Sequence, residues 1–157
     1  MDPNIGLSQE YTKETVKFLH TLLADETVLY TKTRNQHWNI ESENFISIHE
    51  FYESQYHEIE QLIDDIAERI RQLGRLAKGN LQDCLQLTQL KELAYTEDQN
   101  KQIKALLNDH ETICRQLREK IQNIEEEHND PGTTDFLTRV LQWHEKTAWM
   151  LRSHVRW

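Results

Sequence analysis

The chain has 157 residues and a formal net charge of −9 at pH 7, with 27 acidic residues against 18 lysines and arginines. This balance argues against nucleic acid as the main partner, because a protein that binds phosphate backbones normally carries a basic face or tail. No segment approaches the run of about 18 apolar residues that spans a bilayer, and the first residues lack the pattern of a signal peptide. Cys84 and Cys114 fit no metal-binding spacing, so we expect free thiols in a reducing cytoplasm.

Leu, Ile, Glu, Gln and Lys are abundant, whereas only four Gly and two Pro interrupt the chain. This usage favours helices over a sandwich or a barrel. The first predicted helix covers about residues 8–34, where apolar residues recur at steps of three or four. The second covers about residues 45–73, and Gly74 is its stop signal.

A long connection follows, with a short helix predicted at about residues 81–87. Thr96 and Gln99 make a capping-box pattern that opens the third long helix. The fourth covers about residues 134–154, after a break at Pro131 and Gly132. Four amphipathic helices with one long middle connection predict a single all-α domain over residues 1–157, a four-helix bundle.

The second predicted helix carries a row of metal-binding side chains beside its apolar stripe: His49, Glu53, Glu60, Asp64 and Glu68. Most such rows are solvated charged faces, but this one borders the core stripe instead of opposing it. His49 and Asp64 lie about 22 Å apart along one helix, so a single ion cannot bind both. Two copies of the helix packed antiparallel about a twofold axis would bring each His49 beside the partner's Asp64 and Glu68.

A mixed set of imidazole and carboxylate ligands suits iron or zinc, whereas calcium prefers oxygen ligands alone. Few protein ligands for each ion leave open positions, which suits redox chemistry. Two other metal patterns lack support. Glu125 and His128 form an isolated ExxH motif, although a di-iron site inside the bundle needs two. No HExxH motif of a zinc protease occurs.

The segments "YTKTRNQHWNI", "NFISIHEFYE" and "DDIAERIRQLG" resemble, in order and spacing, the Dps family, the small ferritins named as DNA-binding proteins from starved cells. The similarity covers essentially the whole chain. It implies a ferritin-like four-helix bundle that assembles, through twofold dimers, into a hollow homododecamer. It also implies a ferroxidase, which oxidises Fe(II), preferably with hydrogen peroxide, stores the Fe(III) mineral and so protects against oxidative stress.

The resemblance assigns a role to each matching residue. His37 and His49 would bind iron from one subunit, and Asp64 and Glu68 from its twofold mate. This makes a di-iron site between subunits, which zinc can also occupy. Glu53 stands where the family often has an acidic residue near the site, as a direct or water-mediated ligand.

One further residue departs from the family pattern, and another receives its role from the resemblance alone. Arg34 stands where many relatives carry a further His. Trp38 would lie beside the iron, where its indole can intercept stray radicals.

The segment "EEEHNDPGTTD" concentrates acidic side chains before the last helix. By composition alone it is a solvated loop. Family members, however, line a threefold pore with acidic residues from this region, which would focus a negative potential on entering cations. By position, the resemblance predicts pore roles for Glu126, Asp130 and Asp135.

Three functions remain open at this point. The first is the ferroxidase and storage cage, and the second is the same cage acting chiefly as a nucleoid DNA-binding protein. The third is a structural bundle that binds adventitious zinc. The family's Lys-rich N-terminal tail is missing, and only the C-terminal "RSHVRW" is locally basic, which favours the first over the second. His110 and His144 lie on core-facing ladders, where we expect hydrogen-bonded structural histidines.

Overall fold

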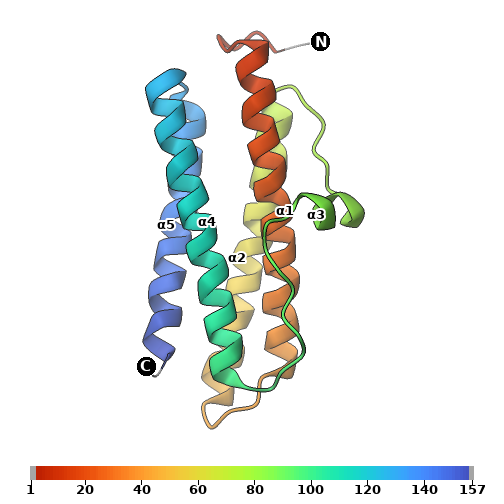
Figure 1. Ribbon diagram of the computed structural model, residues 1–157, viewed down its shortest axis with the longest axis vertical. Helices are drawn as coiled ribbons and strands as arrows, with labels where there is room; N and C mark the ends of the chain where they lie inside the picture. The colour runs from red at the N-terminus through yellow and green to blue at the C-terminus, as the bar shows by residue number, and fades with distance from the viewer. Residues whose placement is uncertain (1–2, 156–157) are drawn as a thin grey trace.

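Five helices account for the regular structure of the computed structural model, which describes residues 3–155 (Figure 1). The last two residues of the basic C-terminal end, Arg156 and Trp157, lie outside the described residues. The helices are α1 (Gln9–Asn39), α2 (Phe45–Gln72), α3 (Leu81–Leu87), α4 (Gln99–Glu127) and α5 (Pro131–His154).

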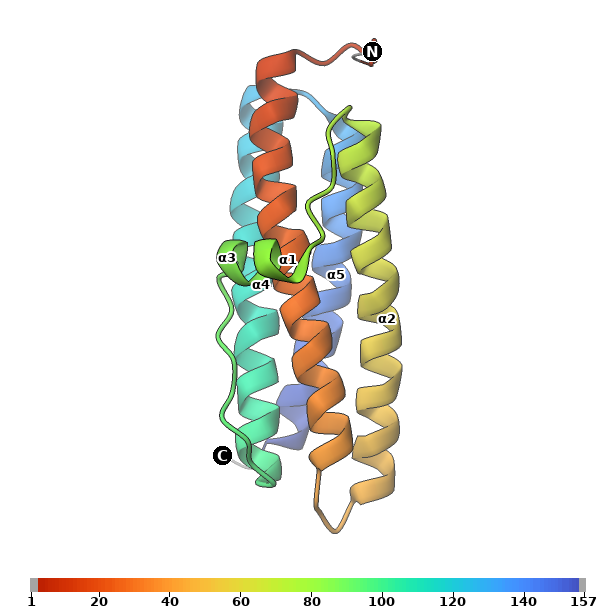
Figure 2. The ribbon, with the colours of Figure 1, turned by 90° about the vertical axis from the view of Figure 1, so that its right-hand side faces the viewer.

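The four long helices form a bundle of two antiparallel pairs, α1 with α2 and α4 with α5 (Figures 1 and 2). A long connection leaves the end of α2 and returns along the bundle to the start of α4. Within it, the short α3 crosses the outside of α1 (Figure 2). A bundle with one such crossover has the ferritin-like connectivity. The predicted all-α bundle with a short helix in its middle connection is therefore confirmed.

Three of the long helices begin at residues whose side chains cap them. Ser8, Asp98 and Asp130 each accept a hydrogen bond from the backbone N–H three residues later. These bonds satisfy amide groups that have no partner inside the helix. At the other end of α2, Gly74 has a φ of 84°, a left-handed conformation that favours glycine. Each of these four helix ends thus has a local chemical cause.

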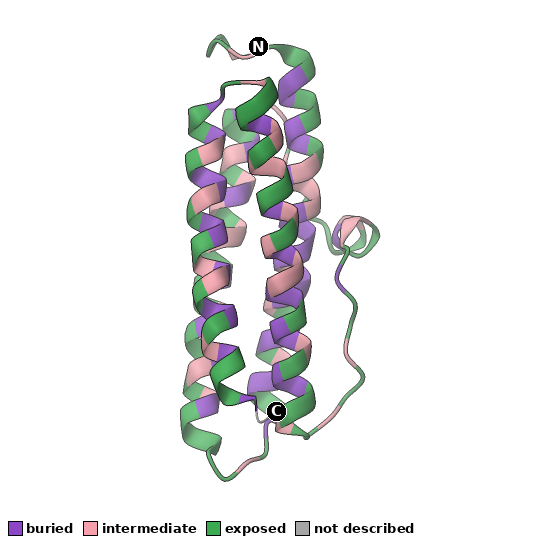
Figure 3. Ribbon diagram, turned by 60° about the vertical axis from the view of Figure 1, so that its left-hand side comes forward, coloured by how far each residue is buried: buried purple, intermediate pink, exposed green. Residues whose placement is uncertain are grey.

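Buried side chains follow one stripe along each long helix and meet in the middle of the bundle (Figure 3). His110 and His144, predicted to lie on the core-facing sides of the last two long helices, are both buried. On α2, however, Phe45 is exposed, and Tyr56 and Ile63 are only half-buried. A single chain therefore leaves part of the apolar stripe of α2 open.

Three predicted boundaries were wrong. Helix α1 continues to Asn39, because no Gly or Pro interrupts it after Arg34. Asp98, not Thr96, caps α4, and the Thr96 hydroxyl instead accepts the N–H of Asp98. Helix α5 begins at Pro131, because proline has no N–H to lose and a suitable φ at the first position of a helix.

No helix within residues 3–155 combines the length and the apolar character that crossing a membrane requires. Both cysteines are free thiols, with Cys84 buried and Cys114 half-buried.

Candidate metal centre

Two histidines face each other where α1 ends and α2 begins. The rings of His37 and His49 stack with their centroids 3.7 Å apart and their planes at 19°. The Nδ1 atom of each lies 2.9 Å from the backbone carbonyl oxygen of the other. Because a carbonyl oxygen can only accept, both Nδ1 atoms must carry a proton. Each neutral ring then keeps its lone pair on Nε2, the tautomer of a metal-binding histidine whose other nitrogen is hydrogen-bonded.

Neighbouring rings hold this pair in position. Phe45 stacks on the ring of His49 at 4.9 Å, and the edge of Tyr56 meets the ring of His37 at 5.3 Å. His37 is buried, with 7% of its surface exposed, whereas His49 is half-buried. The two imidazoles are therefore preorganised at the edge of the core, within reach of a ligand from outside.

Glu53 lies one helical turn after His49, on the exposed side of α2. The hydroxyl of Tyr56 is 3.5 Å from Glu53 Oε1, which is a weak hydrogen bond. Partial desolvation is the main cause that raises the pKa of Tyr56, and the charge of Glu53 is the second. The Glu53 carboxylate thus remains available to a cation.

Asp64 and Glu68 project from α2 several turns away and are both exposed. The structure does not bring them to the histidines of the same chain. Within residues 3–155, no three His, Cys, Asp or Glu side chains come together closely enough to hold a metal ion. One chain therefore offers a histidine pair and a separate carboxylate pair, and their meeting across a twofold axis stays a prediction.

Trp38 follows His37 on the last turns of α1, with 63% of its surface exposed. The guanidinium carbon of Arg34 lies 5.3 Å from the centre of its ring. An indole so exposed beside a histidine pair can react with a species released there, which is the role that the resemblance predicts.

The three residues predicted to line a pore have different surroundings. Glu126 and Asp135 are exposed and have light contacts, with Gln122 and Arg139 respectively. Asp130, in contrast, is buried with 5% of its surface exposed. An oligomer cannot expose it further, because assembly only removes surface.

Hydrogen bonds from three directions surround the carboxylate of Asp130. It accepts from the N–H and hydroxyl of Thr133 and from the hydroxyl of Tyr11 at 2.9 Å, and it lies 3.7 Å from Arg69 Nη2. Burial alone would raise its pKa, but these hydrogen bonds and the Arg69 charge bring the pKa of Asp130 below its ordinary value. Asp130 thus joins α5 to α1 and α2, a role that the sequence pattern did not indicate.

A second pair of histidines occupies the middle of the bundle, fully enclosed. His144 Nε2 lies 2.7 Å from Glu26 Oε1, and its Nδ1 lies 2.8 Å from the Nδ1 of His110. Burial is the main cause that holds the pKa of His110 well below its ordinary value, and the neighbouring His144 is the second. The predicted structural role of both histidines is confirmed. The part of Glu26 was missed, although a Glu within an apolar ladder is itself a signal of a buried partner.

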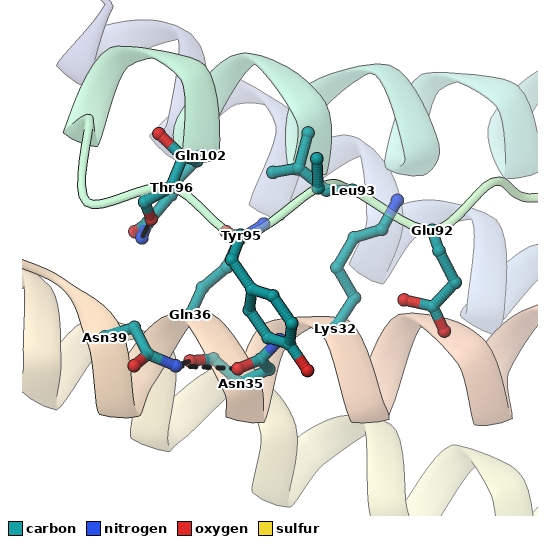
Figure 4. Close-up of a pocket in the computed structure, with 10 residues that line it drawn as sticks. Lys32, Asn35, Gln36, Asn39, Glu92, Leu93, Tyr95, Thr96 and Gln102 are labelled. Carbon is teal, nitrogen blue, oxygen red and sulfur yellow. Dashed lines mark hydrogen bonds between the residues drawn. The ribbon is translucent and has the colours of Figure 1, made fainter.

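A small pocket opens on another face of α1, between that helix, the segment 92–96 and the start of α4 (Figure 4). Its volume is about 20 Å³, and the side chains lining it include Gln36 and Gln102. Both amides are buried, and both polar atoms of Gln36 lack a protein partner. None of the predicted metal ligands lines this pocket. Its size suits a single bound water molecule.

Comparisons with known proteins match nearly the whole chain to one family. A family model described as a ferritin-like domain matches residues 16–156. An uncharacterized low temperature-induced protein of a Nostoc species is 39% identical over 153 residues, covering 97% of this chain and 86% of that protein. DNA protection during starvation protein 2 of Bacillus anthracis is 33% identical over 143 residues, covering 91% and 97%.

A solved structure shares the whole architecture. The Dps protein of Vibrio cholerae O1, described as a member of a broad superfamily of ferritin-like diiron-carboxylate proteins, superposes with a TM-score of 0.91. The two sequences are 28% identical, and the match covers 97% of this chain and 95% of that one.

Proposed function

Because this chain belongs to the Dps family of ferritin-like proteins, we propose that it oxidises Fe(II) with hydrogen peroxide and stores the Fe(III). The oxidation takes place at sites shared between two subunits of a hollow homo-oligomer, built from twofold dimers into a dodecamer. Iron is the substrate and the cargo of this protein, and zinc competes for the same ligands.

One observation carries the proposal, the reciprocal hydrogen bonding of His37 and His49. It uses the Nδ1 of each ring and leaves the Nε2 of both stacked rings outside these bonds, at the edge of the bundle. Two neutral imidazoles alone bind a divalent cation weakly, so carboxylates must complete the site. Asp64 and Glu68, on the same exposed side of α2, supply them when a second copy packs antiparallel.

The half-open apolar stripe of α2 supports this packing. Phe45, Tyr56 and Ile63 belong to the helical ladder of the core, yet a single chain leaves them partly uncovered. A second copy of α2 would cover this surface and bring the partner's Asp64 and the partner's Glu68 toward His37 and His49. Burial of the shared site and burial of this apolar surface then happen together.

The chemistry needs two electrons for each peroxide molecule. Two Fe(II) ions each give one electron, the O–O bond breaks, and two protons from solvent complete two molecules of water. Reduction by a single electron would instead release a hydroxyl radical. In this scheme, Glu53 binds iron directly or through water, and the exposed indole of Trp38 reacts with any radical that escapes.

Iron reaches such a cage through pores. Glu126 and Asp135 are exposed acidic residues near the junction of α4 and α5, and we propose that three copies line an entry channel. Their combined negative potential would concentrate Fe(II) at the opening. Asp130 takes no part in this, since its carboxylate is buried.

Hybrid oligomers test the shared site. One subunit carries His37→Ala with His49→Ala, the other carries Asp64→Ala with Glu68→Ala, and the two are co-expressed with different tags. Each mixed twofold dimer contains one complete and one empty site. We expect peroxide-driven iron oxidation, followed by ferric absorbance, to be lost in each parent and partly restored in the hybrid.

The matched control is His154→Ala, which removes an exposed histidine from the end of α5, outside the proposed contact between two copies of α2, and should leave the rate unchanged. Full activity in a variant lacking all four ligands would disprove the assignment. Activity lost in both parents but not restored in verified hybrids would place the site within one subunit. Absence of iron turnover in the unmodified protein would reject the ferroxidase and leave the DNA-binding cage and the bundle with adventitious zinc.

A DNA-protecting role is the second candidate, since it stands in the names of relatives such as the Bacillus anthracis protein. The net charge of −9 weighs against it. In the basic C-terminal end, Arg152 is already paired with Glu111, with 2.6 Å between Nη1 and Oε1. We expect no tight duplex binding at physiological salt. A strong gel shift that weakens steeply with added salt would establish the second candidate instead.

A further inference from the structure

Arg34 lies on α1 one turn before Trp38 and is held by three aromatic rings. Its guanidinium carbon lies 5.8 Å from the ring centre of Tyr30, 5.3 Å from that of Trp38 and 5.8 Å from that of Tyr56. Its Nη1 also donates a hydrogen bond of 3.0 Å to the hydroxyl of Tyr30. Three cation–π contacts and one hydrogen bond fix an arginine that is otherwise exposed.

This fixed charge lies beside the histidine pair. Arg34 and His37 are three residues apart on one helix, so their Cβ atoms are about 5–6 Å apart. The ring of Tyr56 contacts both side chains. Among residues 3–155, no carboxylate forms an ion pair with Arg34. No ion pair within the described chain therefore neutralises its positive charge, which lies next to a site that would hold two divalent cations. The nearby Glu53 carboxylate contacts the Tyr56 hydroxyl instead.

We propose that Arg34 makes the two cation positions of the shared site unequal, by weakening the binding of the second ion. The inference rests on the proposed function. The first divalent cation meets the imidazoles and the carboxylates of the site, Glu53 included, whose negative charge outweighs the charge of Arg34. The second meets the same guanidinium after much of that negative charge has been neutralised, so the repulsion is no longer offset.

The proposal predicts a site that fills in two steps. The aromatic rings matter because they prevent the guanidinium from turning away when the cation arrives. An arginine free to move into solvent would lower the repulsion at little cost, whereas this one would lose three ring contacts. Arg34 is thus a specificity-determining residue for cation number, and it does not itself bind iron.

Calorimetric titration of the intact oligomer with Co²⁺ tests this inference. In the absence of peroxide, this divalent cation reports binding without the oxidation step. We expect two binding steps for each shared site in the unmodified protein, the second weaker. Arg34→Gln should tighten the second step about tenfold and leave the first nearly unchanged, since one nearby unit charge is removed. Arg34→Lys keeps the charge but loses the planar stacking that holds it in place, so it should tighten the second step by no more than Arg34→Gln does.

Arg115→Gln is the matched control, because it removes the same charge from the exposed surface of α4. An unchanged second step in Arg34→Gln, or a single class of equal sites in the unmodified protein, would overturn the proposal. A second step that Arg34→Lys tightens more than Arg34→Gln would show that the charge is not the cause, and would overturn it too. Loss of the oligomer in Arg34→Gln would assign the arginine to the subunit contact and likewise reject the inference.

The proposed function fails differently. It fails if His37→Ala with His49→Ala leaves the Co²⁺ titration of the oligomer unchanged, whatever Arg34 does. If those histidine changes abolish binding while the Arg34 variants have no effect, the shared site stands and only the inference about Arg34 falls.

Discussion

Two pairs of histidines in this bundle have the same chemistry and opposite surroundings. His110 and His144 lie in the core, where they bond to each other through Nδ1 and His144 bonds to Glu26 through Nε2, so both nitrogens of His144 are used within the protein. His37 and His49 lie at the end of the bundle, and each bonds through Nδ1 to the backbone of the other. The first pair is closed and the second leaves Nε2 open. Whether an imidazole can act as a ligand is thus decided by which nitrogen its neighbours occupy.

The largest expected difference between the pairs is in stability. His144→Ala removes the hydrogen-bond partner of Oε1 in the buried Glu26 carboxylate, whose Oε2 has no partner within residues 3–155. Breaking a buried pair in this way costs about 3–5 kcal/mol of unfolding free energy. Denaturant unfolding of the metal-free protein measures it. A cost no greater than that of His49→Ala would contradict the contrast between a closed and an open pair.

The closed pair should also make stability depend on pH. The pKa of His110 is well below its ordinary value in the folded protein, so below about pH 6.5 the unfolded chain takes up a proton that the folded one does not. Stability attributable to this group should therefore fall with falling pH, by about 1.4 kcal/mol for each unit.

The comparison of the unmodified protein with His110→Gln isolates this effect. Burial is the main cause that raises the pKa values of Asp25 and Asp109, so these groups make stability rise with falling pH. They do so in both proteins, and their effect cancels in the comparison. Parallel curves for the unmodified protein and His110→Gln would show that the pKa of His110 is not lowered by folding.

A similar contrast separates the acidic residues near the start of α5. Asp130→Ala should cost about 1–2 kcal/mol at neutral pH, because it removes a helix cap and its other buried contacts. Since the pKa of Asp130 is lowered by folding, this contribution should be present above about pH 4 and disappear as pH falls through the folded value.

Glu126→Gln with Asp135→Asn should instead leave stability unchanged and slow iron uptake, most clearly at low salt, where electrostatic attraction is least screened. Thermal melts and uptake rates of intact oligomers distinguish the two variants. Unchanged uptake at low ionic strength would exclude this entry route.

Of the two histidine pairs, the open pair has the smaller expected effect on stability. His49→Ala removes one hydrogen bond to the backbone and should cost about 1 kcal/mol. Its larger effect is on metal binding. Zn²⁺ should raise the melting temperature of the unmodified protein and leave that of the variant nearly unchanged, because a ligand stabilises only the state that binds it. An equal rise in both proteins would mean that zinc binds elsewhere.

The sequence by itself determined the number of helices, their approximate limits and most of their inward faces. Those features depend on periodicity and on local caps, which lie within a few neighbouring residues. The same local spacing identified the row on α2 and showed that His49 and Asp64 cannot share an ion within one helix. The resemblance to a known family then added His37 and the remaining roles.

Only the tertiary structure decided which polar side chains are closed and which are open. Glu26 and His144 are 118 residues apart in the chain, as Tyr11 and Asp130 are 119 apart, so no local pattern predicts either contact. The reciprocal bonds of His37 and His49 depend equally on how two helices meet at a turn. Burial and hydrogen bonding between distant segments set the accessible atom of each side chain, and that atom decides the chemistry that the residue can perform.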